Sequence, residues 1–208
     1  MYLTSLRPLV SKTTIKTEFT SYIQDPALNV SKEEARTESI SSPGNTKKGM
    51  MIRSVQTHEI DKLIQLGENT GIFGPGESKQ LLGDTLICLL NNTLPTGHQA
   101  HVLERADGVI VGWLYFGPTD DSDIWNLWWI GIEPQFHGNG HGKMLLKFFE
   151  EVAVGSGAKT AIVETSSIAQ LKRTREFYTL QGYIFTASET DGYGPGEDKI
   201  IFSKQLSS

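Results

Sequence analysis

The sequence predicts an α/β domain over residues 50–208, in which apolar strand-like runs alternate with amphipathic helical runs. Three observations support this fold class. The runs follow one another in the order β-α-α-β-β-β-α-β-α-β-β. Asp107-Gly108 separates two apolar runs, which is a strong signal for a β-hairpin. A junction with three glycines, Gly138, Gly140 and Gly142, joins a very apolar run to an amphipathic one.

The first half of the domain carries the patterns of four strands and two helices. Strands are expected over residues 51–55, 100–106, 108–117 and 123–132, and helices over 57–69 and 76–92. Thr57 is the candidate N-cap of the first helix, because a threonine there precedes apolar residues at helical spacing. Cys88 lies in an apolar run of the second helix, so we interpret it as a packed core cysteine.

The second half repeats the alternation with two helices and three strands. Helices are expected over residues 142–157 and 168–181, and strands over 160–165, 182–189 and 198–206. In the first of these helices, apolar residues line one face, and Gly155 or Gly157 ends it. The segment 187–199 is rich in Gly and Asp and is expected to be a loop.

Residues 1–49 differ in composition from the rest of the chain. They are rich in Ser and Thr, hold few large apolar side chains and end in "SSPGNTKKG". This composition favours a disordered extension. Because the first acidic residue, Glu18, follows three basic ones, an organelle transit peptide is the alternative, as is an upstream start codon with initiation at Met50 or Met51.

Charge and hydropathy exclude some function classes. The net charge is -5, so we expect no general nucleic-acid partner and no membrane-surface partner. No apolar stretch reaches the ~18 residues that a membrane span needs. We therefore expect a cytoplasmic protein, with organelle targeting by residues 1–49 left open.

The glycine junction after residue 132 has the features of an anion site. A strand that runs into a glycine loop and then a helix presents unpaired N–H groups at the positive end of the helix dipole. Glycine lets a ligand approach the backbone and tolerates positive φ. The spacing G-x-G-x-G fits neither the dinucleotide fingerprint nor the P-loop, and a turn without a ligand is the alternative interpretation.

The motif Gln135-x-x-Gly138-x-Gly140 resembles the signature of the GCN5-related N-acetyltransferase (GNAT) family, and "REFYTLQGYIF" (175–185) is similar to that family's last helix and the strand after it. The resemblance covers residues 51 to the C-terminus. It implies an α/β fold with a mixed, mostly antiparallel sheet that splays between the fourth and fifth strands and is flanked by helices. It also implies acetyl-CoA as co-substrate and acetyl transfer to a primary amine.

The resemblance further implies which residues bind acetyl-CoA. Its pyrophosphate is expected on the N–H groups of 138–143, and its pantetheine arm beside residues 130–132, as an added strand at a sheet edge. The expected binding residues are Ile130, Gly131, Ile132, Gln135, His137, Gly138, Asn139, Gly140, His141, Gly142 and Lys143. We interpret His137 and His141 as solvent-facing loop residues, and we expect no metal site.

Acetyl transfer to an amine needs a proton acceptor, and the thiolate that leaves needs a proton donor. Glu164 is the candidate base, because it ends an apolar strand where burial raises the pKa of a carboxyl. Tyr178 matches the family's helix tyrosine and is the candidate acid. Asn126 and Tyr193 are candidate acceptor contacts; Asn126 stands where histone-type members carry a glutamate base.

The acceptor is left open between a small molecule and a peptide amine. Acidic residues near 120–123 and 187–199 favour a cationic acceptor. A non-catalytic acyl-CoA-binding or sensor module on the same fold is the alternative function, and an inactive scaffold is a third. Trp125, Trp128 and Trp129 place much aromatic surface on one strand, which favours a homodimer.

Overall fold

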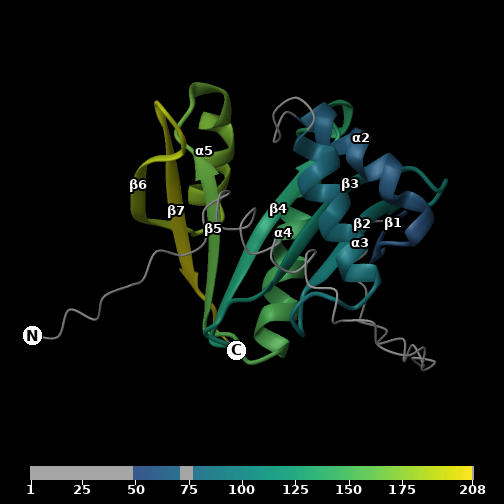
Figure 1. Cartoon of the computed structure of the whole chain (residues 1–208), viewed down its shortest axis with the longest axis horizontal. Coiled ribbons are helices and arrows are strands. Elements are labelled where there is room, and N and C mark those ends of the chain that lie inside the picture. Colours follow the sequence, from purple (N-terminus) through teal and green to yellow (C-terminus); the bar gives the residue numbers. More distant parts are fainter. Residues whose placement is uncertain (1–48, 71–76, 208) are drawn as a thin grey trace, which may run out of the picture.

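The computed structural model describes residues 49–70 and 77–207. The predicted extension 1–49 therefore lies almost entirely outside the described residues. The strands form one seven-stranded sheet in the order β1-β2-β3-β4-β5-β7-β6 (Figure 1). Neighbouring strands are antiparallel except for β4 and β5, which are parallel. The predicted fold class, a mixed and mostly antiparallel sheet, is confirmed.

The strands and helices keep the expected order. The strands are β1 (Met50–Ser54), β2 (Gln99–Arg105), β3 (Ile110–Pro118), β4 (Ile124–Ile132), β5 (Thr160–Ser166), β6 (Ile184–Gly194) and β7 (Glu197–Gln205). The helices are α2 (Ile60–Thr70), α3 (Asp84–Leu90), α4 (His141–Gly155) and α5 (Lys172–Leu180). Short helical turns precede α2, α3, α4 and α5: η1 (Thr57–Glu59), η2 (Ser78–Gly83), η3 (Pro134–Phe136) and η4 (Ala169–Leu171).

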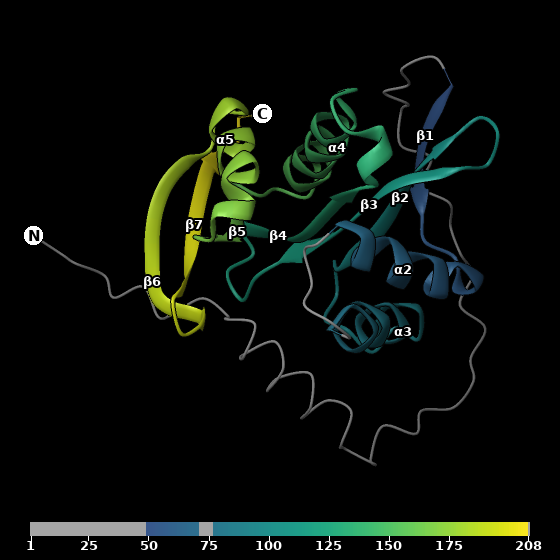
Figure 2. The ribbon, with the colours of Figure 1, turned by 90° about the horizontal axis from the view of Figure 1, so that it is seen from above.

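The sheet is covered on both faces. Figure 2 shows α4 on one side of it and α2 and α3 on the other. One core cluster joins α4 and α5 to residues such as Leu127 and Val163, and the second joins α2, η2 and α3 to residues such as Trp113 and Trp129. Apolar side chains on both faces of β3 and β4 are therefore buried, which explains their continuous apolar sequence.

The pairing between β4 and β5 is short. It runs from Ile124 with Thr160 to Leu127 with Val163 and then stops, although both strands continue. In Figure 1 the two strands lie together at their first residues and separate toward their ends. The predicted splay is thus present, and it opens at the end of the sheet where α4 begins.

The structure differs from the expected elements in three places. Gln56, not Thr57, caps the first helical segment, because the Glu59 carboxylate accepts the Gln56 N–H at 2.8 Å. The expected helix 76–92 begins as the π-helical turn η2 before α3. The expected loop 187–199 is wrong: β6 extends to Gly194, and β7 starts at Glu197 after two residues.

The tryptophans of β4 do not form an exposed aromatic surface. Trp125 packs in the α4 cluster and is 4% exposed, while Trp129 packs in the α2–α3 cluster and is 8% exposed. Trp128 stacks on His98, with ring centroids 4.7 Å apart. Because Trp125 and Trp129 are buried and Trp128 is partly buried, these rings do not form the large exposed surface that favoured a homodimer.

Candidate active site

The glycine loop, residues 137–142, connects η3 to the first turn of α4. Gly140 is the N-cap of α4 with φ +78°, a conformation that strongly favours glycine. Gly138 also has φ +78°, and a Cβ atom built on it has nothing within 4 Å, so its outer side is open. The Met144 N–H makes the first helical bond, to the Gly140 carbonyl. The preceding N–H groups thus have no carbonyl within the helix and are available to a ligand.

Side chains of the loop hold its backbone. His137 Nε2 lies 2.7 Å from the Ile132 carbonyl oxygen, and Asn139 Nδ2 donates to the Phe136 carbonyl at 3.2 Å. His141 is partly buried, and its Nδ1 is buried against the protein. The interpretation of His141 as solvent-facing is therefore wrong. Gln135 and Lys143 are exposed at the edge of the loop. The His137 and Asn139 contacts thus hold the backbone of the loop in place.

The end of β4 presents a strand edge beside this loop. A β-bulge places Trp128 as an extra residue, because Leu127 pairs with Phe116 and Trp129 with Tyr115 of β3. After the bulge, residues 129–132 continue to pair with β3, whereas the ladder with β5 has ended at Leu127. Gly131 allows close packing, since a Cβ there would lie 2.9 Å from Trp113 Nε1. This end of β4, beyond its pairing with β5, is the place where we expect a ligand to add as a strand.

A pocket of about 120 Å³ lies in the splay between β4 and β5. Five elements contribute to its lining: Trp128, Trp129 and Ile130 from β4, Glu164, Thr165 and Ser166 from β5, Leu171 from η4, Thr174 and Tyr178 from α5, and Tyr193 from β6. Four of the site residues expected from the sequence therefore line this pocket together: Ile130, Glu164, Tyr178 and Tyr193. Aromatic rings and one carboxylate form its walls.

Glu164 is the acidic residue in this pocket's lining. Its Oε1 atom is buried and has no hydrogen-bond partner among the described residues. Burial raises the pKa of the Glu164 carboxyl to about 7, while the positive charge of Lys199 acts to lower it and the negative charge of Glu189 to raise it. A carboxyl with this pKa changes its protonation state near neutral pH.

Two tyrosines face the same pocket. Tyr178 is 4% exposed, and its ring packs against Phe177, Tyr183 and Phe202. Burial raises the pKa of the Tyr178 phenol above its ordinary value of 10.0, so the phenol keeps its proton at neutral pH. Burial and then the charge of Glu164 also raise the pKa of Tyr193. A proton acceptor and two proton donors therefore share one cavity.

One expected contact residue lies outside the pocket lining. Asn126 is 2% exposed and stands where β4 and β5 still pair, opposite Ile162. Its Oδ1 atom has no partner among the described residues. The structure buries Asn126 before the splay opens, and it does not bring this amide into the pocket.

Sequence reasoning missed two residues that shape the site. Arg175 Nη1 donates to the carbonyls of Ser166 and Ile168, so it ties α5 to the end of β5. Lys199 of β7 is 1% exposed and pairs with Glu189 at 2.7 Å. The alternation of β7 places Lys199 on one face, but no pattern in the sequence signals that this face is buried.

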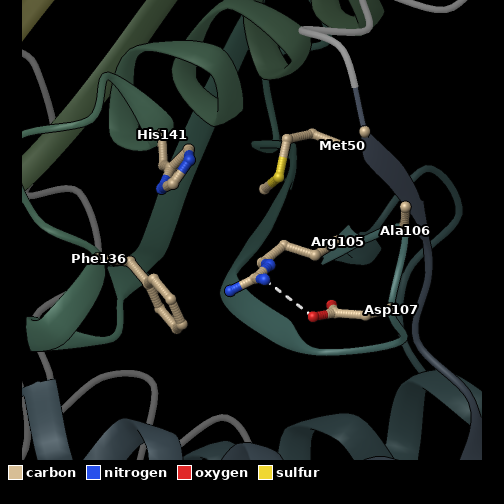
Figure 3. A pocket seen from close by; sticks show the side chains of 7 residues that line it. Met50, Arg105, Ala106, Asp107, Phe136 and His141 are labelled. Carbon is tan, nitrogen blue, oxygen red and sulfur yellow. Dashed lines mark hydrogen bonds and ion pairs between the residues drawn. The ribbon is translucent and has the colours of Figure 1, made fainter.

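A larger pocket of about 430 Å³ lies beside the glycine loop, with Phe136 and His141 in its lining. Figure 3 shows its lining, in which Arg105 lies between Phe136 and Asp107, with His141 nearby. Arg105 donates to Asp107 at 2.8 Å, and its guanidinium lies 5.8 Å from the centre of the Phe136 ring. The lining of this larger pocket contains none of the expected acid–base residues. The expected acid–base residues, Glu164 and Tyr178, both line the smaller pocket instead.

The described residues contain no group of three His, Cys, Asp or Glu side chains able to hold a metal ion. Over the same residues, no helix is long and apolar enough to cross a membrane.

The sequence model of the Acetyltransferase (GNAT) family matches residues 75–183, which is more than half of the chain. This chain belongs to the GNAT family of acetyltransferases. The matched range includes β4, the glycine loop, β5 and α5, and thus the whole splay and all of the pocket lining except Tyr193 of β6.

Individual GNAT relatives are distant. The chain is 30% identical over 108 residues to an amino-acid acetyltransferase of Pseudomonas paraeruginosa, a match that spans 52% of this chain and 25% of that relative. A solved protein of Desulfovibrio desulfuricans, assigned to the GNAT family, is 25% identical with a TM-score of 0.67 and covers 76% of this chain and 99% of its own. A Salmonella typhimurium protein solved with acetyl-CoA is 18% identical with a TM-score of 0.57, over 76% of this chain and 95% of its own.

Proposed function

We propose that this GNAT family member transfers the acetyl group of acetyl-CoA to the primary amine of a small molecule or peptide. One observation carries the proposal. A carboxyl whose pKa is raised to about 7, Glu164, and a protonated phenol, Tyr178, line the same pocket where β4 and β5 part. Such a pair suits a reaction that removes a proton from one reactant and supplies a proton to another.

The residues present fit acetyl-CoA. The N–H groups at the start of α4 and the open side of Gly138 suit a pyrophosphate, because they offer donors without side-chain obstruction. The end of β4 at residues 130–132, beyond its pairing with β5, suits the amide groups of a pantetheine arm. When bound, acetyl-CoA supplies a thioester whose acyl carbon accepts an amine and whose thiol leaves.

The acid–base roles follow from where each proton is held. Glu164 accepts a proton from the acceptor amine at its carboxylate, directly or through a water molecule, and so converts an ammonium into a nucleophile. Tyr178 holds its proton at Oη and is the donor for the leaving sulfur. As the nitrogen bonds to the acyl carbon and the carbon–sulfur bond breaks, the nitrogen loses its second proton, which replaces the one that Tyr178 gives to the sulfur. Glu164 then releases the first proton to solvent.

The relatives support an amine acceptor without naming it. The Pseudomonas relative is an amino-acid acetyltransferase, but the match covers a quarter of that protein. Trp128 and Tyr193 give the pocket aromatic walls, and Glu164 gives it a negative charge above neutral pH. These features favour a small cationic amine, which interacts well with aromatic faces and a carboxylate.

Release of free thiol from acetyl-CoA in the presence of a panel of amino acids, polyamines, aminoglycosides and peptides tests the proposal. We expect thiol release to depend on one class of amine. Mass spectrometry of the acetylated product then identifies the acceptor. Isothermal titration calorimetry with coenzyme A runs in parallel. Binding without amine-dependent release would support the sensor function instead, and no binding at all would reject both.

A further inference from the structure

Lys199 is an unusual residue for a protein interior. Lysine is almost never fully buried unless its charge is paired. Lys199 lies near the middle of the sheet's β5-β7-β6 part, is 1% exposed, and has its Nζ 2.7 Å from Glu189 Oε2. Glu189 itself is 44% exposed and reaches Lys199 from the outer strand β6. A positive charge has therefore been brought inside next to the pocket.

The irregular end of β6 covers this lysine. Pairing between β6 and β7 is interrupted between Glu189 and Gly194, and Asp191 there has a φ of 54°. A Cβ built on Gly192 would lie 2.8 Å from the Lys199 Cβ and 3.1 Å from the Glu189 carbonyl oxygen. Only glycine permits this close approach. The Gly- and Asp-rich segment that resembles a loop in the sequence thus serves to bury Lys199.

Strand register places Lys199 on the same face of the sheet as Glu164. Lys199 pairs with Ser166 of β5 and with Glu189 of β6, and Glu164 is two residues before Ser166. Glu164 is consequently the diagonal neighbour of Lys199, a separation that a long side chain spans. The groups that face Glu164 are Lys199 from β7, Glu189 and Tyr193 from β6, and Tyr178 from α5.

We propose that Lys199 is a positioning residue, whose ammonium, anchored by Glu189, supplies the buried positive charge that lets Glu164 ionise and accept a proton at neutral pH. Without that charge, burial alone would keep the carboxyl protonated. The direction in which each neighbour moves the pKa of Glu164 agrees with this role: Lys199 lowers it and Glu189 raises it. The inference rests on the proposed role of Glu164 as base.

Two charge-removing variants test the proposal, because they are expected to act in opposite directions. In Lys199→Met the midpoint of Glu164 ionisation moves up by about one pH unit or more, since an opposite charge is lost. In Glu189→Gln the midpoint of Glu164 ionisation moves down, because a negative charge near Glu164 is lost while the positive charge of Lys199 remains. The midpoint is measured by carbon-13 NMR of protein labelled at the glutamate carboxyl carbon, with Glu164→Gln used to assign the signal.

Lys204→Met is the matched control. Lys204 lies on the same strand but pairs with Glu150, and its register opposite Ala161 puts it on the other face of the sheet. We expect no change of the Glu164 midpoint in this variant. Circular dichroism confirms that each variant is folded.

An unchanged midpoint in Lys199→Met, or shifts of the same sign in Lys199→Met and Glu189→Gln, would overturn the inference. The titration needs no substrate, so its result does not depend on whether an acceptor has been found. If thiol release is observed, the acidic limb of its kcat/KM profile should move with the NMR midpoint in each variant. A purely structural role for Lys199 would lower activity without that movement.

Discussion

The sheet has two parts that meet along four residue pairs, 124–127 of β4 with 160–163 of β5. The part formed by β1–β4 offers a ligand mainly backbone, the N–H groups of the glycine loop and the edge of β4. The part formed by β5–β7, with α5, offers side chains, namely Glu164, Tyr178, Tyr193 and, behind them, Lys199. In the proposed function, binding and chemistry are carried by different parts of the chain, and variants should separate the two.

The largest expected effect is loss of binding on the backbone side. Gly140→Val places a β-branched residue at φ +78° and adds bulk where the N–H groups face a ligand. We expect coenzyme A binding to fall by at least about 100-fold in calorimetry, consistent with strain of 1–3 kcal/mol and loss of the N–H contacts. Gly155→Val is the control, because a Cβ at Gly155 has nothing within 4 Å and its φ is ordinary. Equal affinity in the two variants would contradict a backbone-based site.

The next effect separates chemistry from binding. Glu164→Gln keeps the shape of the side chain but removes the proton acceptor. We expect kcat to fall by about 10²–10⁴-fold, the usual contribution of a general base, while coenzyme A affinity changes little. In the wild-type protein, kcat/KM should rise as the pH increases through about 7, where Glu164 loses its proton. Glu133→Gln, beside the glycine loop, is the matched control. If kcat is unchanged in Glu164→Gln, the base is a residue other than Glu164.

A smaller loss is expected for Tyr178→Phe. The ring keeps its packing against Phe177 and Phe202, and only the phenol oxygen is removed. Because a thiolate leaves without help more easily than an alkoxide, we expect kcat to fall by about 10–10²-fold with nearly unchanged coenzyme A affinity. Tyr183→Phe serves as control, since Tyr183 is buried in the same ring cluster but does not line the pocket. If coenzyme A affinity falls and kcat persists, Tyr178 is a binding residue.

How far the sequence predicts these two parts depends on how local the signals are. The strand, glycine loop and helix from β4 to α4 follow from periodicity and glycine spacing within some 30 contiguous residues, so they are predicted well. The splay and the meeting of Glu164 with Tyr178 follow only from the family resemblance. The burial of Lys199 depends on β6 bending over β7 at Gly192, and a Gly- and Asp-rich segment looks like any loop until its partner strand is known.

The smallest expected effect concerns stability and shows the energetic cost of the side-chain part. The pKa of Glu164 is raised to about 7 in the folded protein, against 4.5 when unperturbed, so the unfolded chain ionises more readily. Glu164 therefore lowers the free energy of unfolding as the pH rises from about 4.5 to about 7, and this destabilisation stays constant at higher pH. Glu164→Gln should raise the free energy of unfolding by about 1–3 kcal/mol at pH 8 and leave it unchanged at pH 4. Urea denaturation at both pH values measures the difference, with Glu133→Gln as control. The gain in unfolding free energy of Glu164→Gln over wild type should be larger at pH 8 than at pH 4. An equal gain at both pH values would mean that the Glu164 carboxyl is well solvated and that burial does not raise its pKa.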